Sequence, residues 1–183
     1  MLGLPRGGVP VAAAVASAVG APLDVFVVRK LGVPGREELA MGAVATGGAR
    51  VVNREVIDAL AIPDDVLAAV AAAEERELAR REAAYRGERR PPDLADRPVI
   101  LVDDGLATGA TMRAALRAVG QAGSGPVTVA VPTAPAATLA ALRAEADEVV
   151  WAASPEPFLA VGASYRDFAP TTDDEVRKLL SRT

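Results

Sequence analysis

Short apolar runs rich in valine alternate along the chain with longer segments of helical periodicity. The clearest runs predict strands over residues 2–4, 25–29, 99–102 and 127–131, and weaker runs predict strands over 43–45, 50–53 and 148–151. These runs are continuously apolar rather than alternating, which favours strands that are covered on both faces, as in a parallel sheet.

Helical patterns follow several of these runs. They predict helices over residues 11–19, 64–86, 111–119 and 136–144, with Pro10 at the start of the first helix and Gly20 at its end. A capping box, Thr172-Asp173-Asp174-Glu175, opens a last helix through residue 180. The alternation predicts an α/β fold with a mostly parallel, doubly wound sheet flanked by helices.

The length of 183 residues predicts a single domain over 1–183, with residues 86–98 as a polar connection between its two halves. The charge-dense segment 76–90 has both signs interspersed, which is typical of a solvated helix face. Residues 1–4 already have the pattern of a buried strand, which leaves open whether a segment is missing upstream.

Composition narrows the chemistry. The chain has no His and no Cys, which excludes disulfides, Cys/His zinc sites, Ser-His-Asp triads and cysteine nucleophiles. Carboxylates, Arg, Lys, hydroxyls, backbone amides and hard metals such as Mg²⁺ remain. The net charge of −4 argues against a broad nucleic-acid-binding surface. No apolar run reaches about 18 residues, so we expect a cytoplasmic protein that does not enter the membrane.

The segment from Val99 to Thr111 carries the most specific signal. Four apolar residues predict a buried strand, and Asp103 and Asp104 follow at its carboxyl end, where parallel sheets bind ligands. A small, hydroxyl-rich loop then opens a helix, whose first amides suit a phosphate. The two carboxylates can accept hydrogen bonds from sugar hydroxyls. The residues therefore suit a sugar phosphate.

This segment resembles the phosphoribosyl-diphosphate (PRPP) motif of type I phosphoribosyltransferases, and residues 102–112 look most like adenine phosphoribosyltransferases. The resemblance implies the type I phosphoribosyltransferase fold with a small hood. It also implies that Asp103 and Asp104 hold the ribose hydroxyls and, mostly through PRPP and water, Mg²⁺. The 5-phosphate would be wrapped by Gly105, Leu106, Ala107, Thr108, Gly109, Ala110 and Thr111.

Two further loops are similar to loops of the same family. Residues 4–8 lie between a strand and a helix and resemble the pyrophosphate loop, which would make Arg6 catalytic, Gly7 and Gly8 PRPP-binding, and a non-proline cis peptide expected near Arg6. Residues 28–38 begin as a strand and run into a Gly/Pro-punctuated loop. There Arg29 would bind PRPP and Lys30 would be catalytic, closing over the pyrophosphate.

The scarce aromatic residues gather between 151 and 168. By resemblance this segment is the hood, mainly residues 151–170, with Trp151 and Phe158 as candidate base-binding residues. The alternative is a satellite aromatic core that holds the C-terminal helix.

The resemblance implies an enzyme that transfers the phosphoribosyl group of PRPP to a nitrogen nucleophile, with a purine weakly preferred, and releases pyrophosphate. Two departures favour an alternative, a regulatory protein that binds PRPP or a nucleotide without catalysis. Position 107 is Ala, where hypoxanthine-guanine enzymes have Asp, and residues 41–45 lack the catalytic loop Glu of adenine enzymes. The expected partners are PRPP and a small-molecule acceptor, and the family resemblance suggests a homodimer.

Overall fold

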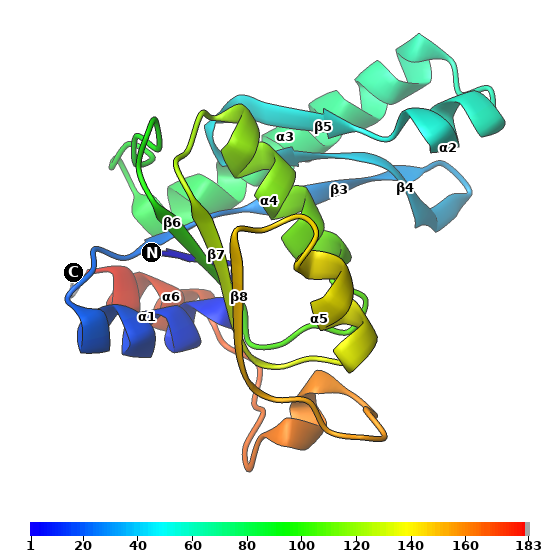
Figure 1. The fold of residues 1–183 in the computed structure, drawn as a ribbon. Coiled ribbons are helices and arrows are strands. Elements are labelled where there is room, and N and C mark those ends of the chain that lie inside the picture. The colour runs from blue at the N-terminus through cyan, green and yellow to red at the C-terminus, as the bar shows by residue number, and fades with distance from the viewer. Residues whose placement is uncertain (182–183) are drawn as a thin grey trace.

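The computed structural model describes residues 1–181, except the side chain of Glu37. Its central sheet has five parallel strands in the order β2-β1-β6-β7-β8 (Figure 1). The strands are β1 (Leu2–Gly3), β2 (Asp24–Val25), β6 (Val99–Val102), β7 (Val127–Thr133) and β8 (Glu148–Ala153). The parallel sheet that the apolar runs predict is therefore confirmed.

Helices cover both faces of this sheet. On one face lie α4 (Ala110–Gln121) and α5 (Ala136–Leu142), and on the other α1 (Gly8–Val19), α3 (Asp64–Arg86) and α6 (Asp173–Leu180). Each face has its own apolar cluster, one around Met112 and Leu142 and the other around Val9 and Leu180. Burial on both faces explains why the strands are continuously apolar.

The predicted helices are confirmed with shifted ends. The helix expected from residue 11 begins at Gly8, so Pro10 lies inside the first turn, where its missing N–H costs no helical hydrogen bond. The capping box at Thr172 and Glu175 is present in full. A short helix, α2 (Arg54–Ala59), was not predicted.

The prediction for residues 25–53 is wrong in one respect. The expected strand 25–29 is divided between β2 in the parallel sheet and β3 (Val28–Val33) in a second sheet. There β3, β4 (Arg36–Ala45) and β5 (Ala49–Val52) pair antiparallel. The segment expected as an open loop after Lys30 is thus a β-hairpin. Two short 3₁₀ helices, η1 (Thr46–Gly48) and η2 (Val161–Ser164), complete the assignment.

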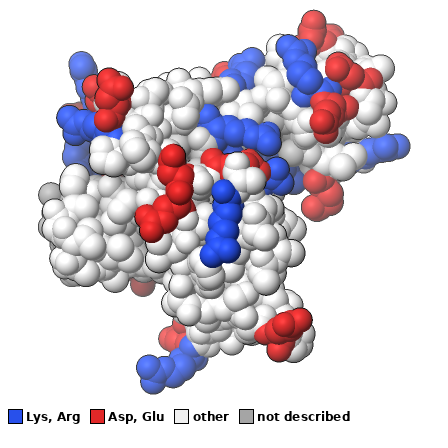
Figure 2. Space-filling view, viewed as in Figure 1, with Lys and Arg blue, Asp and Glu red and all other residues white. Residues whose placement is uncertain are grey.

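Charged side chains of both signs are interspersed on the face shown in Figure 2. The charge-dense part of α3 is mostly solvated, but Arg86 is an exception. Its side chain is 2% exposed and forms ion pairs of 2.7 Å with Asp24 and Glu82. Among the described residues, no helix is both long enough and apolar enough to cross a bilayer.

Candidate functional site

The candidate site lies where the connections of the parallel sheet change direction. Strand β1 is hydrogen-bonded to β2 on one side and to β6 on the other. The loops that leave the carboxyl ends of β1 and β6 therefore face each other across a crevice, which is where open α/β sheets bind ligands. These loops are residues 4–7 and 103–109, which lie within two of the three segments predicted to bind PRPP.

The two loops touch. A Cβ atom built on Gly7 would lie 1.9 Å from Oδ2 of Asp104. One built on Gly8 would lie 2.7 Å from the carbonyl oxygen of Val102 and 2.8 Å from Cα of Asp103. A side chain at Gly7 would displace the Asp104 side chain, and one at Gly8 would displace the backbone of the acidic loop. The glycine pair is therefore required by close approach, in addition to any amide it offers a ligand.

The loop after the acidic pair is fixed from two neighbouring elements. The Leu106 amide donates to the carbonyl of Thr133 on β7 at 3.0 Å, and the Thr138 hydroxyl donates to the carbonyl of Ala107 at 2.7 Å. Gly109 has φ of 73° and ends the loop directly before α4. The first turn of α4 presents amides without helical acceptors, which suits a phosphate.

Burial makes the acidic pair costly to ionise. Asp103 is largely removed from solvent, and this burial, together with repulsion from Asp104, raises its pKa to about 8. Burial also raises the pKa of Asp104. The backbone amide of Asp104 donates to Oδ1 of Asp103 at 2.9 Å, which offsets only part of this cost. A cation or a set of sugar hydroxyls at this position would stabilise the ionised pair.

The acidic pair fits Mg²⁺ as a partial ligand set. Mg²⁺ prefers oxygen ligands and in phosphate enzymes is held by one or two carboxylates together with substrate phosphates and water. Among the described residues no group of three or more acidic side chains could hold a metal alone. Asp103 and Asp104 would therefore hold Mg²⁺ jointly with the oxygens of a bound sugar diphosphate.

The two cations of β3 point to opposite sides of the hairpin. Arg29 forms an ion pair of 2.7 Å with Glu74 of α3, so its guanidinium already has an acidic partner, and its role in PRPP binding stays a prediction. Lys30 lines a cavity of about 90 Å³ with Ala110 and Thr111 at the start of α4. Lys30 thus lies beside the start of α4, and its predicted catalytic role stays a prediction.

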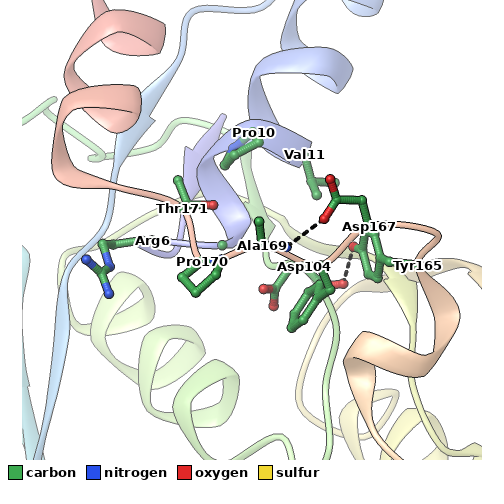
Figure 3. A pocket seen from close by; sticks show the side chains of 11 residues that line it. Arg6, Pro10, Val11, Asp104, Tyr165, Asp167, Ala169, Pro170 and Thr171 are labelled. Atoms are coloured by element: carbon green, nitrogen blue, oxygen red, sulfur yellow. Dashed lines mark hydrogen bonds between the residues drawn. The ribbon is translucent and has the colours of Figure 1, made fainter.

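Arg6 follows the Pro5–Arg6 cis peptide, as expected. It lines a pocket of about 490 Å³ together with Gly7, Asp104, Tyr165 and Phe168. Within this pocket its guanidinium is directed away from Asp104 (Figure 3), and its Nη1 lies 3.7 Å from Oδ1 of Asp173 on α6.

The hood forms as expected, but different aromatic residues face the pocket. The Tyr165 hydroxyl donates to the carbonyl of Asp104 (Figure 3). The Tyr165 and Phe168 ring centroids lie 5.0 Å apart. Trp151 instead lies on β8 under Arg143, whose Cζ is 4.7 Å from the centroid of the Trp151 ring. Phe158 is half-buried and does not line the pocket. Trp151 and Phe158 therefore lie outside this pocket, and their role in binding a base stays a prediction.

The clustering of aromatic residues was the available signal for Tyr165 and Phe168. This clustering could not show which of the aromatic residues face the pocket, because that depends on the path of the chain after β8 ends at Ala153. Only that path decides which rings face Asp104.

A family model described as the phosphoribosyl transferase domain matches residues 1–158, which include both crevice loops. The chain belongs to the phosphoribosyl transferase domain family. Two Mycobacterium tuberculosis proteins, Rv0571c and MT0597, are each 47% identical to this chain over 182 residues. Their names describe them provisionally as phosphoribosyl transferases. These residues are 100% of this chain and 41% of each relative.

Solved structures agree with this family. TT1426 from Thermus thermophilus superposes with a TM-score of 0.89 at 45% identity, covering 99% of this chain and 86% of that one. The AQ2163 protein from Aquifex aeolicus has a TM-score of 0.50 at 16% identity, covering 88% of this chain and 56% of that one, and shares the fold alone. This phosphoribosyl transferase domain therefore has the type I phosphoribosyltransferase fold.

Proposed function

We propose that this domain transfers the 5-phosphoribosyl group of PRPP to a nitrogen nucleophile, with a purine base as the preferred acceptor. The observation that carries the proposal is the contact between the Gly7–Gly8 loop and the Asp103–Asp104 pair, beside the phosphate-binding start of α4. This contact brings groups suited to a diphosphate, a sugar and a 5-phosphate into one crevice.

The reaction breaks the bond between C1 of the ribose and the diphosphate oxygen, which leaves with the electron pair. The acceptor nitrogen forms the new bond to C1 and loses its proton to solvent. Mg²⁺ bound to the diphosphate would neutralise part of the charge that develops on the leaving group. No covalent intermediate on the protein is required.

The residues of this chain would act by positioning and electrostatics. Asp103 and Asp104 would accept hydrogen bonds from the ribose 2- and 3-hydroxyls, and the first amides of α4, with Lys30 beside them, would hold the 5-phosphate. Amides of the Gly7–Gly8 loop and Arg6 would stabilise the departing pyrophosphate. The pocket under Tyr165 and Phe168 would receive the acceptor ring.

The deciding experiment is calorimetric titration of PRPP with Mg²⁺, followed by a pyrophosphate-release assay over a panel of purine and pyrimidine bases. Binding with release for one base supports the proposal and identifies the acceptor. Binding without release for any base favours the regulatory alternative. Absence of PRPP binding by the folded protein contradicts the proposed transfer and leaves only a regulatory protein that binds a nucleotide.

Asp104→Asn tests the site directly. It removes a charge from the crevice and keeps the side-chain shape, so we expect turnover to fall by about 10²-fold or more with little change in melting temperature. Normal turnover in a variant that melts like the wild type would remove Asp104 from the site.

A further inference from the structure

Arg6 lines a second cavity, apart from the pocket that holds Asp104 and Tyr165. This cavity has a volume of about 210 Å³ and lies between the loop after β1, the C-terminal half of α3 and the start of α6. Its lining residues are Arg6, Arg80, Arg81, Ala84, Tyr85 and Asp173. All of them except Ala84 are polar or charged.

The cavity carries more positive than negative charge. Glu77 on α3 accepts hydrogen bonds from Arg80 at 2.7 Å and from Arg81 at 2.8 Å, so one carboxylate serves two guanidiniums. Asp173 is the single acidic residue among those lining the cavity in the described part of the chain. Three guanidiniums thus face two carboxylates, which favours an anion as occupant.

The contact that holds Arg6 is a weak one. Its Nη1 lies 3.7 Å from Asp173, whereas a charge-assisted N–H···O bond is about 2.8 Å. The same Asp173 oxygen accepts the Tyr85 hydroxyl at 3.2 Å. An anion with several acceptor oxygens would offer both Arg6 and Tyr85 better-placed partners than Asp173 does.

We infer that this cavity binds a phosphate group, held by Arg6, Arg81 and the Tyr85 hydroxyl. A phosphate has the charge to balance the excess guanidinium and the oxygens to accept from all three donors. Arg81 is better placed than Arg80, because its side chain is 35% exposed against 65%. The phosphate has two sources, free inorganic phosphate or the outer phosphate of pyrophosphate. With free phosphate as the source, the inference goes beyond the proposed transfer and rests on the cavity itself. With pyrophosphate as the source, it rests on the proposed function.

The test is calorimetric titration of inorganic phosphate and of pyrophosphate, without Mg²⁺, into the wild type and two variants with opposite expected effects. Arg81→Gln removes a charge-assisted donor, so we expect binding to weaken about tenfold. Asp173→Asn removes the competing carboxylate, so we expect binding to tighten. Arg76→Gln removes the same charge from an exposed position of α3 outside the cavity and should change nothing.

Further variants separate the two sources and the neighbouring phosphate loop. If inorganic phosphate binds more weakly to Arg81→Gln but binds Thr111→Val as it binds the wild type, the cavity takes free phosphate. If Arg81→Gln weakens the binding of pyrophosphate but not of inorganic phosphate, and Gly7→Ala also weakens the binding of pyrophosphate, the cavity takes the outer phosphate of pyrophosphate.

The inference is overturned if neither anion binds the wild type, or if Arg81→Gln binds both anions as Arg76→Gln does. If either of these results is found in a protein that turns over PRPP normally, the cavity inference fails and the proposed function stands. Conversely, if phosphate binding depends on Arg81 but the protein does not bind PRPP, the cavity inference stands and the proposed function fails.

Discussion

At the scale of single residues, the site combines two features that cost stability. Asp103 is a half-buried carboxyl group at the end of a strand, and Gly7 and Gly8 are conformationally free residues forced into one arrangement. Neither feature helps the fold, and both bring into the crevice the groups that we propose to bind the ligand. Stability lost at these positions is typical of functional sites.

The raised pKa of Asp103 predicts how stability depends on pH. Its folded-state pKa of about 8 exceeds the ordinary value of 3.8, so between these values the native state binds more protons than the unfolded state. Stability from this group therefore falls as pH rises from about 4 to 8. Asp103→Asn lacks this titration, and its melting temperature should exceed that of the wild type by a margin that grows over this range.

The measurement is thermal unfolding of both proteins at several pH values. At this chain length 1 kcal/mol corresponds to about 2–4 °C. A margin that stays constant or shrinks between pH 4 and 8 would contradict a raised pKa at Asp103.

The two neighbouring glycines should respond differently to substitution by alanine. In Gly7→Ala the new methyl group meets the end of the Asp104 side chain, which can rotate away, so we expect lost PRPP binding and nearly normal stability. In Gly8→Ala it meets backbone atoms of Val102 and Asp103, so we expect a loss of about 1–3 kcal/mol in unfolding free energy.

Urea unfolding and PRPP titration distinguish the two outcomes. Gly120→Ala is the control, because its Cβ would meet nothing within 4 Å on a helix. This change should stabilise by about 0.5–1 kcal/mol. Equal loss of stability in Gly7→Ala and Gly8→Ala would show that the acidic loop cannot yield at Asp104.

At the scale of elements, α3 joins the two sheets. It packs on β3 and β4 through Ala71 and Leu78, and its last residue, Arg86, reaches back to β2. The Arg86 guanidinium pairs with Asp24 and Glu82 and donates to the carbonyl of Val25. This network fixes the end of the helix against the edge strand of the parallel sheet.

Removing Arg86 should therefore be far more costly than removing an exposed arginine. Arg86→Gln leaves the carboxylates of Asp24 and Glu82 without their buried partner, and we expect a loss of about 3–5 kcal/mol in unfolding free energy. Arg50→Gln breaks the half-exposed pair with Glu75 and should cost less than about 1 kcal/mol. Equal values in urea unfolding would show that the Arg86 network contributes no more than a surface pair.

At the scale of the whole molecule, the crevice is assembled from parts distant in the chain. The loop after β1, the loop after β6 and the hood meet only when β1 lies between β2 and β6. A ligand that bridges these parts should stabilise the entire domain, because it binds only when all three are in place.

This coupling predicts a shift in melting temperature with PRPP and Mg²⁺. At about 100 times the dissociation constant, ligand binding adds about 2.7 kcal/mol, or roughly 5–11 °C at this chain length. Asp104→Asn should reduce the shift sharply. A full shift in Asp104→Asn, or none in the wild type at saturation, would contradict the assigned site.

The sequence alone determined the features that depend on local chemistry. Buried valine runs, the Thr172 capping box and the acidic pair before a small, hydroxyl-rich loop each depend on neighbouring residues, and each was found in place. The family resemblance rested on the same local strings. By contrast, the division of residues 25–29 between two sheets depends on pairing with distant strands, which no local pattern encodes.

Tertiary structure decided which side chains share a space. Arg29 pairs with Glu74, Trp151 packs under Arg143, and Arg86 is buried, although each is preceded and followed by residues typical of a surface or a strand. The contact of Gly7 with Asp104 likewise joins residues almost a hundred positions apart. Such contacts depend on how helices and sheets pack in three dimensions, and that packing also brings Arg6, Arg81 and Tyr85 around one cavity.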